Sequence, residues 1–304
     1  MIINQSVVED LFVNLNTAFN KSLAETSTQF GRTAMTVQSN GKSTTYDFID
    51  DFPKMREWVG DKHIKNLAAH SFSIANKEYE STIEVKRVDV ETDQLGIYLP
   101  RVQTAAVASA KLPDELLTAL KDSAFTTGLG YDGVAFYSAS HPVTNSAGVA
   151  STFSNVSNAA LSAASLSAAS SSYGAARLAI MTMADYDGRK LGLIPDLLEV
   201  PPALEATARI LLESDKFSDQ APNPYRGTAS IMVNPLLSSS TAWFLHCTNA
   251  PLKPFIYQER KAPKVVSLIG AETEFMTAKY LFGVEASCNV GFGLPQLSYG
   301  STGV

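Results

Sequence analysis

The stretch from Gly41 to Gly96 constrains the fold most, because it is too polar and irregular to fill a hydrophobic core. Charged residues interrupt its first half at short intervals: Lys42, Asp47, Asp50, Asp51, Lys54, Arg56 and Glu57. From Phe72 to Val90 apolar residues alternate with the period of a β-strand, but the alternation changes phase near Asn76 and near Lys86. Each one-residue slip sends side chains to the opposite face. The sequence therefore predicts a long ribbon that bends at these two places.

Helices are predicted on both sides of this ribbon. Ser6 and Glu9 fit a capping box, and an apolar stripe with helical spacing follows: Val8, Leu11, Leu15, Phe19 and Leu23. One helix cannot bury this stripe alone, so it must pack on the body of the protein or on a neighbouring molecule. The series from Leu95 to Phe125 predicts the longest element, about 45 Å if unbroken at ~1.5 Å per residue. Pro100 and Pro113 are expected to kink or interrupt it.

The rest of the chain mixes helix and strand signals. Residues 145–172 are rich in Ser and Ala and predict a surface loop that passes into a helix of small residues. The further elements are a helix over Tyr173–Met183, a turn at Asp185–Gly188, a strand over Leu197–Val200, a helix from Pro201 to about Ser214, and mixed strands from Ala229 to Leu297. This order predicts an α+β or mixed α/β fold.

The composition suits a protein whose surface is partly covered by partners. With 304 residues, the chain is long enough for one large or two moderate domains. Only 18% of its residues are charged, whereas the surface of a soluble monomer typically carries about a quarter or more. The net charge of -6 and the lack of a dense basic cluster argue against tight nucleic-acid binding. The N-terminus does not resemble a signal peptide, and no stretch reaches the ~18 apolar residues of a membrane span, so we expect no membrane.

Motifs that would indicate a cofactor or metal are incomplete. The Gly128–Gly133 segment matches GxGxxG, but a helix is predicted before it and a strand after it, the reverse of a dinucleotide site. The Gly41–Ser43 segment resembles the end of a phosphate-binding loop, yet Thr36 occupies the position of the required glycine. The Asp185–Gly188 run lacks a glutamate at the twelfth position of a calcium loop, which is Asp196. We therefore predict neither cofactor nor metal.

Histidines and cysteines indicate no strong catalytic centre. The histidines are His63, His70, His141 and His246, without HxxxH or HExxH spacing. His141 is the most distinctive, because Ser138 and Ser140 adjoin it, as a hydrolase would require. The favoured alternative is a histidine hydrogen-bonded in a turn ahead of a proline. Cys247 and Cys288 are far apart in the sequence, so we expect buried free thiols.

Several short segments match a known pattern when they are taken together. They are Phe52–Pro53 with Glu57–Gly60, Ala69–Ser71 with Ile74–Lys77, Leu95–Tyr98, Pro113–Leu116, Tyr131–Gly133 and Ser140–Pro142. As a set they resemble the Mu-like gpT group of phage major head subunits, best over residues 30–145. The remainder resembles the group by the order of its elements, notably Pro201–Glu205 and Pro295–Tyr299. The Ser/Ala-rich insertion at 145–172 departs from the group.

The resemblance implies the HK97-type capsid fold, an α+β fold with named parts. These are an N-terminal arm (1–40), an extended E-loop (41–90), a P domain with the spine helix (91–150), an A domain (151–272), and a return to the P domain with the C-terminus (273–304). It implies no catalytic residue, because the members of the group are structural proteins.

The resemblance also implies a function and partners. A tailed-phage major capsid protein would form hexamers and pentamers of an icosahedral head, the virion shell, around double-stranded DNA that it does not read. Portal, separately encoded scaffold and decoration proteins are expected partners, and assembly is expected in the host bacterial cytoplasm. Two alternatives are an encapsulin-like compartment around a protein cargo and a soluble hydrolase centred on His141.

Apolar residues of the ribbon and of the first helix are the candidate subunit-interface residues. They are Phe52, Trp58, Val59, Phe72 and Tyr79 in the ribbon, and Val8, Leu11, Leu15 and Phe19 in the helix. A two-stranded ribbon is marginally stable in water, so we expect it to gain order by lying across an adjacent subunit. Phe52, Trp58 and Val59 would be its anchors, because aromatic residues dominate interface energetics.

Overall fold

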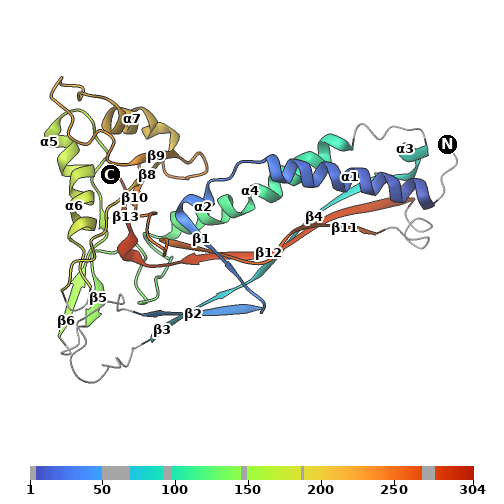
Figure 1. Ribbon diagram of the computed structural model, residues 1–304, viewed down its shortest axis with the longest axis horizontal. Helices are drawn as coiled ribbons and strands as arrows, with labels where there is room; N and C mark the ends of the chain where they lie inside the picture. Colours follow the sequence, from blue (N-terminus) through green and yellow to red (C-terminus); the bar gives the residue numbers. More distant parts are fainter. Residues whose placement is uncertain (1–4, 50–68, 92–97, 145–148, 186–187, 269–277) are drawn as a thin grey trace.

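Two sheets define two parts of the computed structural model, which describes residues 5–49, 69–91, 98–144, 149–185, 188–268 and 278–304. A four-stranded sheet with the order β1-β11-β12-β4 runs along an elongated part (Figure 1). A five-stranded sheet with the order β7-β13-β10-β8-β9 forms a compact part at one end. Helices and mixed sheets together give the α+β class. Within the described ranges no helix is both long enough and apolar enough to cross a membrane.

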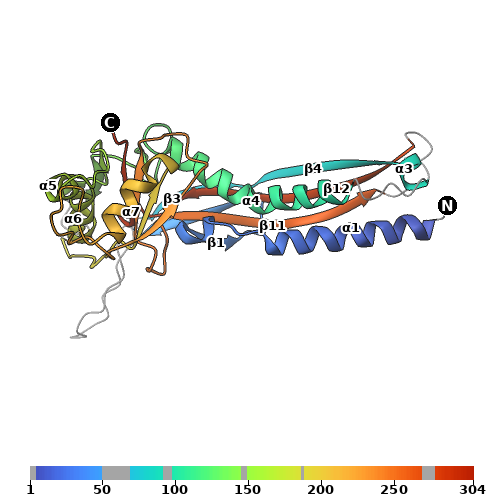
Figure 2. The same ribbon diagram turned by 90° about the horizontal axis from the view of Figure 1, so that it is seen from above.

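The elongated part is a sheet with helices on one face. Strands β11 (Phe255–Leu268) and β12 (Lys279–Phe292) are antiparallel, β4 (Lys77–Lys86) pairs with the other side of β12, and β1 (Ala34–Gln38) runs parallel to β11. Helices α1 (Gln5–Glu25) and α4 (Leu99–Ser123) lie side by side along this sheet (Figure 2). Alternate residues of β12, such as Phe282 and Val284, point into the layer between sheet and helices. The period-two burial of β12 and the helical stripe of α1 thus meet in one core.

Helix α4 continues through Pro113, where the sequence predicted a kink or an interruption, so the helix is not interrupted there. Pro100 lies in the first turn, where a missing backbone N–H breaks no helical hydrogen bond. Pro113 is buried, and the turns around it are held by packing, because Ala106 before it and Leu117 after it are also buried. Asp114 accepts hydrogen bonds from the backbone N–H of Phe30 at 2.6 Å and of Gln29 at 3.0 Å. Tertiary contacts therefore outweigh the local cost of the proline.

The predicted ribbon over Phe72–Val90 is two strands that belong to different sheets. Strand β3 (Ala69–Ala75) pairs with β2 (Ser43–Ile49), whereas β4 joins the long sheet. The change of sheet falls at Asn76, whose side chain donates to the Gly41 carbonyl and the Ser39 hydroxyl at 2.9 Å each. The second phase change, at Lys86, is where β4 ends and the short helix α3 (Arg87–Glu91) begins. The places of the slips were predicted correctly, but not the change of sheet.

The core of the compact part lies around Tyr173, Trp243 and Leu245 and extends to Ile74 of β3 and Ile256 of β11. The strand predicted over Leu197–Val200 is β8, and the helix predicted after Pro201 is η3 (Pro202–Leu204) followed by α7 (Glu205–Glu213). The other elements here are β5 (His141–Thr144), β6 (Ala150–Phe153), β7 (Val156–Ser157), α5 (Leu166–Ala169), η2 (Ser170–Gly174), α6 (Ala175–Thr182), β9 (Ser230–Val233), β10 (Trp243–His246), η4 (Pro295–Leu297) and β13 (Ser298–Ser301). The helix of small residues predicted within 145–172 and the helix predicted over Tyr173–Met183 therefore form one helical run from Leu166 to Thr182, through a π-helical turn.

The chain passes between the two parts more often than the sequence suggested. Strand β11 lies within the range expected for the A domain, yet it pairs with β12 in the long sheet. Strand β13 lies within the range expected for the return to the P domain, yet it pairs with β10 in the compact sheet. The reason is long-range strand pairing, which local sequence patterns do not encode.

Candidate assembly surfaces

The hairpin β2–β3 is anchored at its base on the face of the long sheet opposite the helices (Figure 1). Gln258 is buried there; its side chain accepts from the Tyr46 hydroxyl at 2.8 Å and donates to the Ile74 carbonyl at 3.1 Å. Asn289 donates to the Ala75 carbonyl at 2.6 Å. Gly291 allows this close approach, because a Cβ at that position would collide with Ile74. The base of the hairpin is thus fixed to the long sheet. Within the described residues, β2 and β3 pair only with each other.

The structure places the ribbon candidates in two groups. Phe52, Trp58 and Val59 lie outside the described residues. Phe72 is half-buried and packs against a cluster of buried residues that includes Ile74 and Ile256. Tyr79 is half-buried and lines a shallow cavity of about 200 Å³ between β4 and α4. These two side chains therefore already contact their own chain, and a neighbouring copy would reach only their exposed edges.

The first helix requires a correction. Leu11, Leu15 and Phe19 are buried inside their own chain, against α4 and β12, so they are core residues rather than open interface residues. Phe12, which the stripe did not include, is also buried and stacks on Phe282 with 5.9 Å between ring centroids. The physical reason is that α1 docks on the body, one of the two options its stripe allowed. The side chain of Val8 lies outside the described residues.

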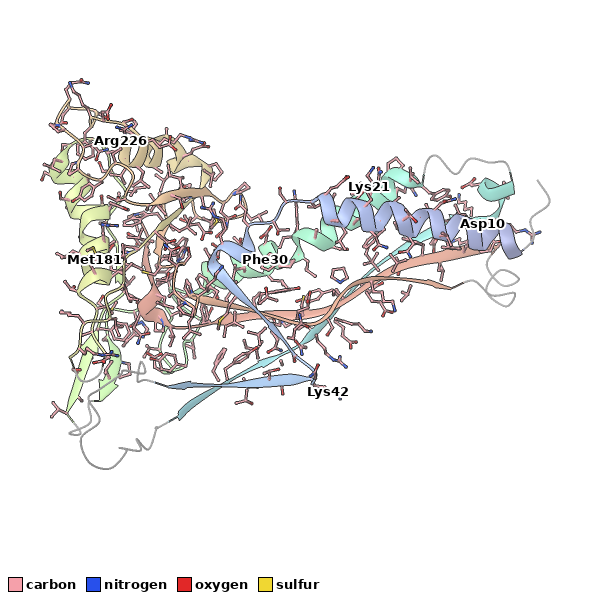
Figure 3. The ribbon with its side chains drawn as sticks, viewed as in Figure 1. Asp10, Lys21, Phe30, Lys42, Met181 and Arg226 are labelled. Atoms are coloured by element: carbon pink, nitrogen blue, oxygen red, sulfur yellow. The ribbon has the colours of Figure 1, made fainter. Side chains whose placement is uncertain are left out.

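Several exposed apolar side chains were missed by the sequence reasoning. They are Val13, Val88, Leu99, Leu129, Val149, Leu166, Leu178, Met181, Ile194, Leu236, Leu252, Val266 and Val304. In α6, Leu178 is 63% exposed whereas Ile180 is fully buried, and Met181 lies at the outer edge of the compact part (Figure 3). A hydrophobic sequence pattern does not separate such positions from the core, since both sides of α6 are apolar. Exposed apolar positions on both parts suit a subunit that packs against copies of itself.

The open face of the long sheet carries cross-strand ion pairs. Lys279 lies 2.6 Å from Glu84, Lys261 lies 3.6 Å from Glu285, and Arg260 lies 3.4 Å from Glu78. The first pair joins β12 to β4, the second joins β11 to β12, and the third joins β11 to β4 across β12. All three pairs are solvent-exposed. Exposed pairs of this kind contribute little stability and mainly favour one register.

His141 is buried in a hydrogen-bonded cluster rather than placed at a reactive site. Its Nδ1 lies 2.5 Å from Asp132 Oδ2, and its Nε2 lies 3.0 Å from Asn155 Oδ1. The ring stacks on Phe153 with 4.7 Å between centroids. Both ring nitrogens thus contact side chains other than serine, so the geometry supplies no activated nucleophile. His141 is hydrogen-bonded as favoured, although it begins strand β5 instead of lying in a turn.

The segments that partly match cofactor-binding or metal-binding motifs have structural roles. The Gly128–Gly133 segment forms a turn after α4, in which the N–H of Gly130 donates to the Val134 carbonyl at 2.7 Å. Asp185 accepts from the Arg189 side chain at 2.8 Å. Cys247 and Cys288 are buried free thiols, as predicted, and burial raises the pKa of the Cys247 thiol to about 12. Among the described residues, no group of three or more His, Cys, Asp or Glu side chains is arranged to hold a metal ion.

Comparison with known proteins identifies the family. The family described as Mu-like prophage major head subunit gpT matches residues 8–166, 159–237 and 234–303. The chain belongs to this family. It is 25% identical over 303 residues to the Mu-like prophage FluMu major head subunit of Haemophilus influenzae, covering 99% of this chain and 75% of that protein. It is 27% identical over 300 residues to the major capsid protein of Escherichia phage Mu, covering 98% of this chain and 74% of that protein.

Solved structures give the same fold for this head subunit. A chain of the procapsid of bacteriophage JBD30 has a TM-score of 0.63 and 29% identity, covering 98% of this chain and 76% of that chain. A virus-like particle from Pyrococcus furiosus has a TM-score of 0.57 and 10% identity, covering 95% of this chain and 98% of that chain, which shows the fold alone. The fold is therefore that of the HK97-like phage capsid proteins. The head subunit is a structural virion protein that assembles into a shell, and not an enzyme.

Proposed function

We propose that the head subunit assembles into hexamers and pentamers of an icosahedral head that encloses double-stranded DNA. The observation that carries this proposal is the family match along nearly the whole chain, joined to a likeness to an assembled procapsid at 29% identity. Head-to-tail contacts form a closed ring when the rotation between copies closes, and an icosahedral shell requires rings of both five and six. Modest contacts between many copies then add up through multivalency.

In this proposal the described elements take the roles of a capsid subunit. Helix α1 belongs to the N-terminal arm, hairpin β2–β3 with the residues between its strands in the sequence is the E-loop, α4 is the spine helix of the P domain, and the five-stranded sheet with α5 to α7 is the A domain. The anchored base and free strands of the hairpin support this role, because a two-stranded sheet is marginally stable until another surface covers it. Portal, scaffold and decoration proteins are its proposed partners, and the host cytoplasm is the proposed place of assembly.

The experiment that tests the proposal removes the proposed aromatic anchor of the E-loop. We expect Trp58→Ala to leave the subunit folded by circular dichroism but to reduce the yield of closed particles severalfold in electron micrographs, since truncated interface aromatics commonly cost about 2 kcal/mol or more. Asn14→Ala is the control, because Asn14 is an exposed polar residue on α1 and belongs neither to the proposed anchors nor to the exposed apolar positions.

Two outcomes would overturn parts of the proposal. Wild-type particle yield from Trp58→Ala would show that this tryptophan is not an assembly anchor. Wild-type particles from phage-producing cells that hold protein cargo, with no nuclease-protected DNA, would favour a compartment shell instead of a phage head.

A further inference from the structure

A cluster of buried polar side chains lies where the compact part meets helix α4. Its centre is the ion pair between Lys121 of α4 and Glu199 of β8, with 2.6 Å between Lys121 Nζ and Glu199 Oε2. His246 of β10 contacts the same carboxylate oxygen through Nε2 at 3.1 Å. Lys121 is 1% exposed, and Glu199 and His246 are fully buried. Each part of the molecule thus contributes one charge of this pair, and both charges are shielded from water.

Neutral side chains complete the cluster from both parts. Lys121 Nζ also donates to Thr33 Oγ1, at the end of α2 (Phe30–Thr33), at 3.3 Å. The Asn234 side chain, which follows β9, donates to Glu199 Oε1 at 2.7 Å and to Thr118 Oγ1 of α4 at 3.1 Å. Each of these polar atoms therefore has at least one partner, which is the condition under which a buried charge pair is tolerated.

The cluster continues on the far side of the imidazole into the last strand. His246 Nδ1 lies 2.9 Å from the Ser298 hydroxyl of β13, and that hydroxyl lies 2.7 Å from the Tyr137 hydroxyl. Tyr137 belongs to the segment that follows α4. Two hydrogen-bonded routes therefore connect α4 and its continuation to the compact sheet.

Apolar packing is interrupted on one side of this cluster, whereas on the other side the Phe255 ring lies against both Lys121 and His246. A cavity of about 220 Å³ lies between α4 and the segment after β9, and its lining includes Asp114, Thr118, Lys121, Asn234 and Leu236. Apolar contacts are non-directional, so two surfaces can shift against each other with little change in buried area. A buried ion pair favours one relative position of the two elements that carry it. Separating the charges would leave each one buried without a partner to offset its desolvation.

We propose that Lys121, Glu199 and His246 form an orientation clamp, which fixes the angle between α4 and the five-stranded sheet and thereby selects one shell curvature. The shape of each subunit sets the curvature of a closed shell, so a small spread of this angle becomes a spread of particle size. The clamp is distinct from the E-loop contacts proposed above, because it acts inside one subunit. It rests on the assembly of the chain into closed shells.

The decisive variant removes both charges at once and keeps the size of the side chains. Lys121→Met with Glu199→Gln leaves no unpaired buried charge, so the subunit should fold, and replacing a buried pair by neutral groups often leaves stability unchanged. We expect circular dichroism and thermal unfolding close to wild type, but a diameter distribution roughly twofold broader in electron micrographs, with open or malformed particles. Lys261→Met with Glu285→Gln is the matched control, because this pair is exposed on the long sheet.

Uniform shells of wild-type diameter from the folded double variant would overturn the clamp. If that variant does not fold, Lys121→Gln with Glu199→Gln serves instead, since it also leaves no unpaired buried charge; uniform wild-type shells from it would overturn the clamp equally, because buried charge would then not be needed. A failure of the wild-type protein itself to form closed shells would count against the proposed function and is thereby distinguished from a failure of the clamp. Broader shells from the exposed-pair control would also overturn the clamp, because buried charge would then not be the cause.

Discussion

Two ion pairs in this head subunit have the same length and opposite surroundings. Lys121–Glu199 and Lys279–Glu84 each have 2.6 Å between nitrogen and oxygen. The side chains of the first pair are 2% and 0% exposed, whereas those of the second are 37% and 55% exposed. Water screens the exposed charges and competes for their hydrogen bonds, but it does not reach the buried ones. The comparison teaches that burial, and not distance, decides what each pair does.

The surroundings also decide what each pair holds together. Lys279–Glu84 joins neighbouring strands β12 and β4, which backbone hydrogen bonds already fix in register. Lys121–Glu199 joins a helix of the elongated part to a strand of the compact part, where no ladder of backbone bonds connects the two elements. The buried pair therefore sets a relation between the two parts, and the exposed pair only reinforces a pairing that exists without it.

The largest effect is expected from removing only the cation of the buried pair. Lys121→Met leaves Glu199 as an uncompensated charge, and such a loss typically destabilises a protein by about 3–5 kcal/mol. Chemical denaturation of the unassembled subunit should measure this loss in the free energy of unfolding. Adding Glu199→Gln should recover most of it, because the unpaired charge is then gone. A loss for the single variant as small as that of an exposed lysine would show that water reaches the pair.

Acidification should weaken the junction between the two parts. Burial lowers the pKa of His246, whose ordinary value is 6.5, although the bond to Glu199 partly opposes this. A lowered folded pKa means that the stability is present above pH 6.5 and is lost as the pH falls below it.

Glu199 adds a second acidic step. Burial alone would raise the pKa of this carboxyl, but Lys121 and the bond from His246 outweigh burial and lower the pKa from 4.5 to about 2. Its stabilising contribution is therefore present above pH 4.5 and is lost between pH 4.5 and about 2. Unfolding free energies measured from pH 8 downward should fall first below pH 6.5, by less than the Lys121→Met loss. His246→Asn should remove this first step, and an unchanged profile in that variant would contradict the assignment.

The local elements of both regions could be predicted from the sequence, whereas the pairing between distant segments could not. The α1 stripe, the strand Leu197–Val200 and the phase slips at Asn76 and Lys86 all follow from short-range periodicity. Strand β4 belongs to the long sheet because it pairs with β12, which lies far along the chain. No local pattern specifies that partner. Pro113 stays inside a helix because packing on both sides of it outweighs its propensity.

The buried pair left a signal in the sequence that was not used. Glu199 interrupts an otherwise apolar strand between Leu198 and Val200, and Lys121 follows Leu117 by one helical turn on the inward side of α4. A charge in a buried strand or stripe indicates that a partner of opposite charge is buried with it. What the sequence does not give is which lysine meets which carboxylate, because that depends on how α4 packs against the compact sheet. The proposed anchors of the ribbon, Phe52, Trp58 and Val59, remain a prediction for the same reason, since their partner is another copy.

The smallest effect is expected from the exposed pair, and it completes the comparison. Lys279→Met removes the cation that faces Glu84, but the remaining carboxylate stays in water and needs no partner. Exposed pairs contribute about 0.2–1 kcal/mol, so the free energy of unfolding should change by no more than this. The change should shrink further in high salt, which screens exposed charges and leaves buried ones almost unaffected. A salt-independent loss as large as that of Lys121→Met would mean that the long sheet, and not the junction, depends on its charges.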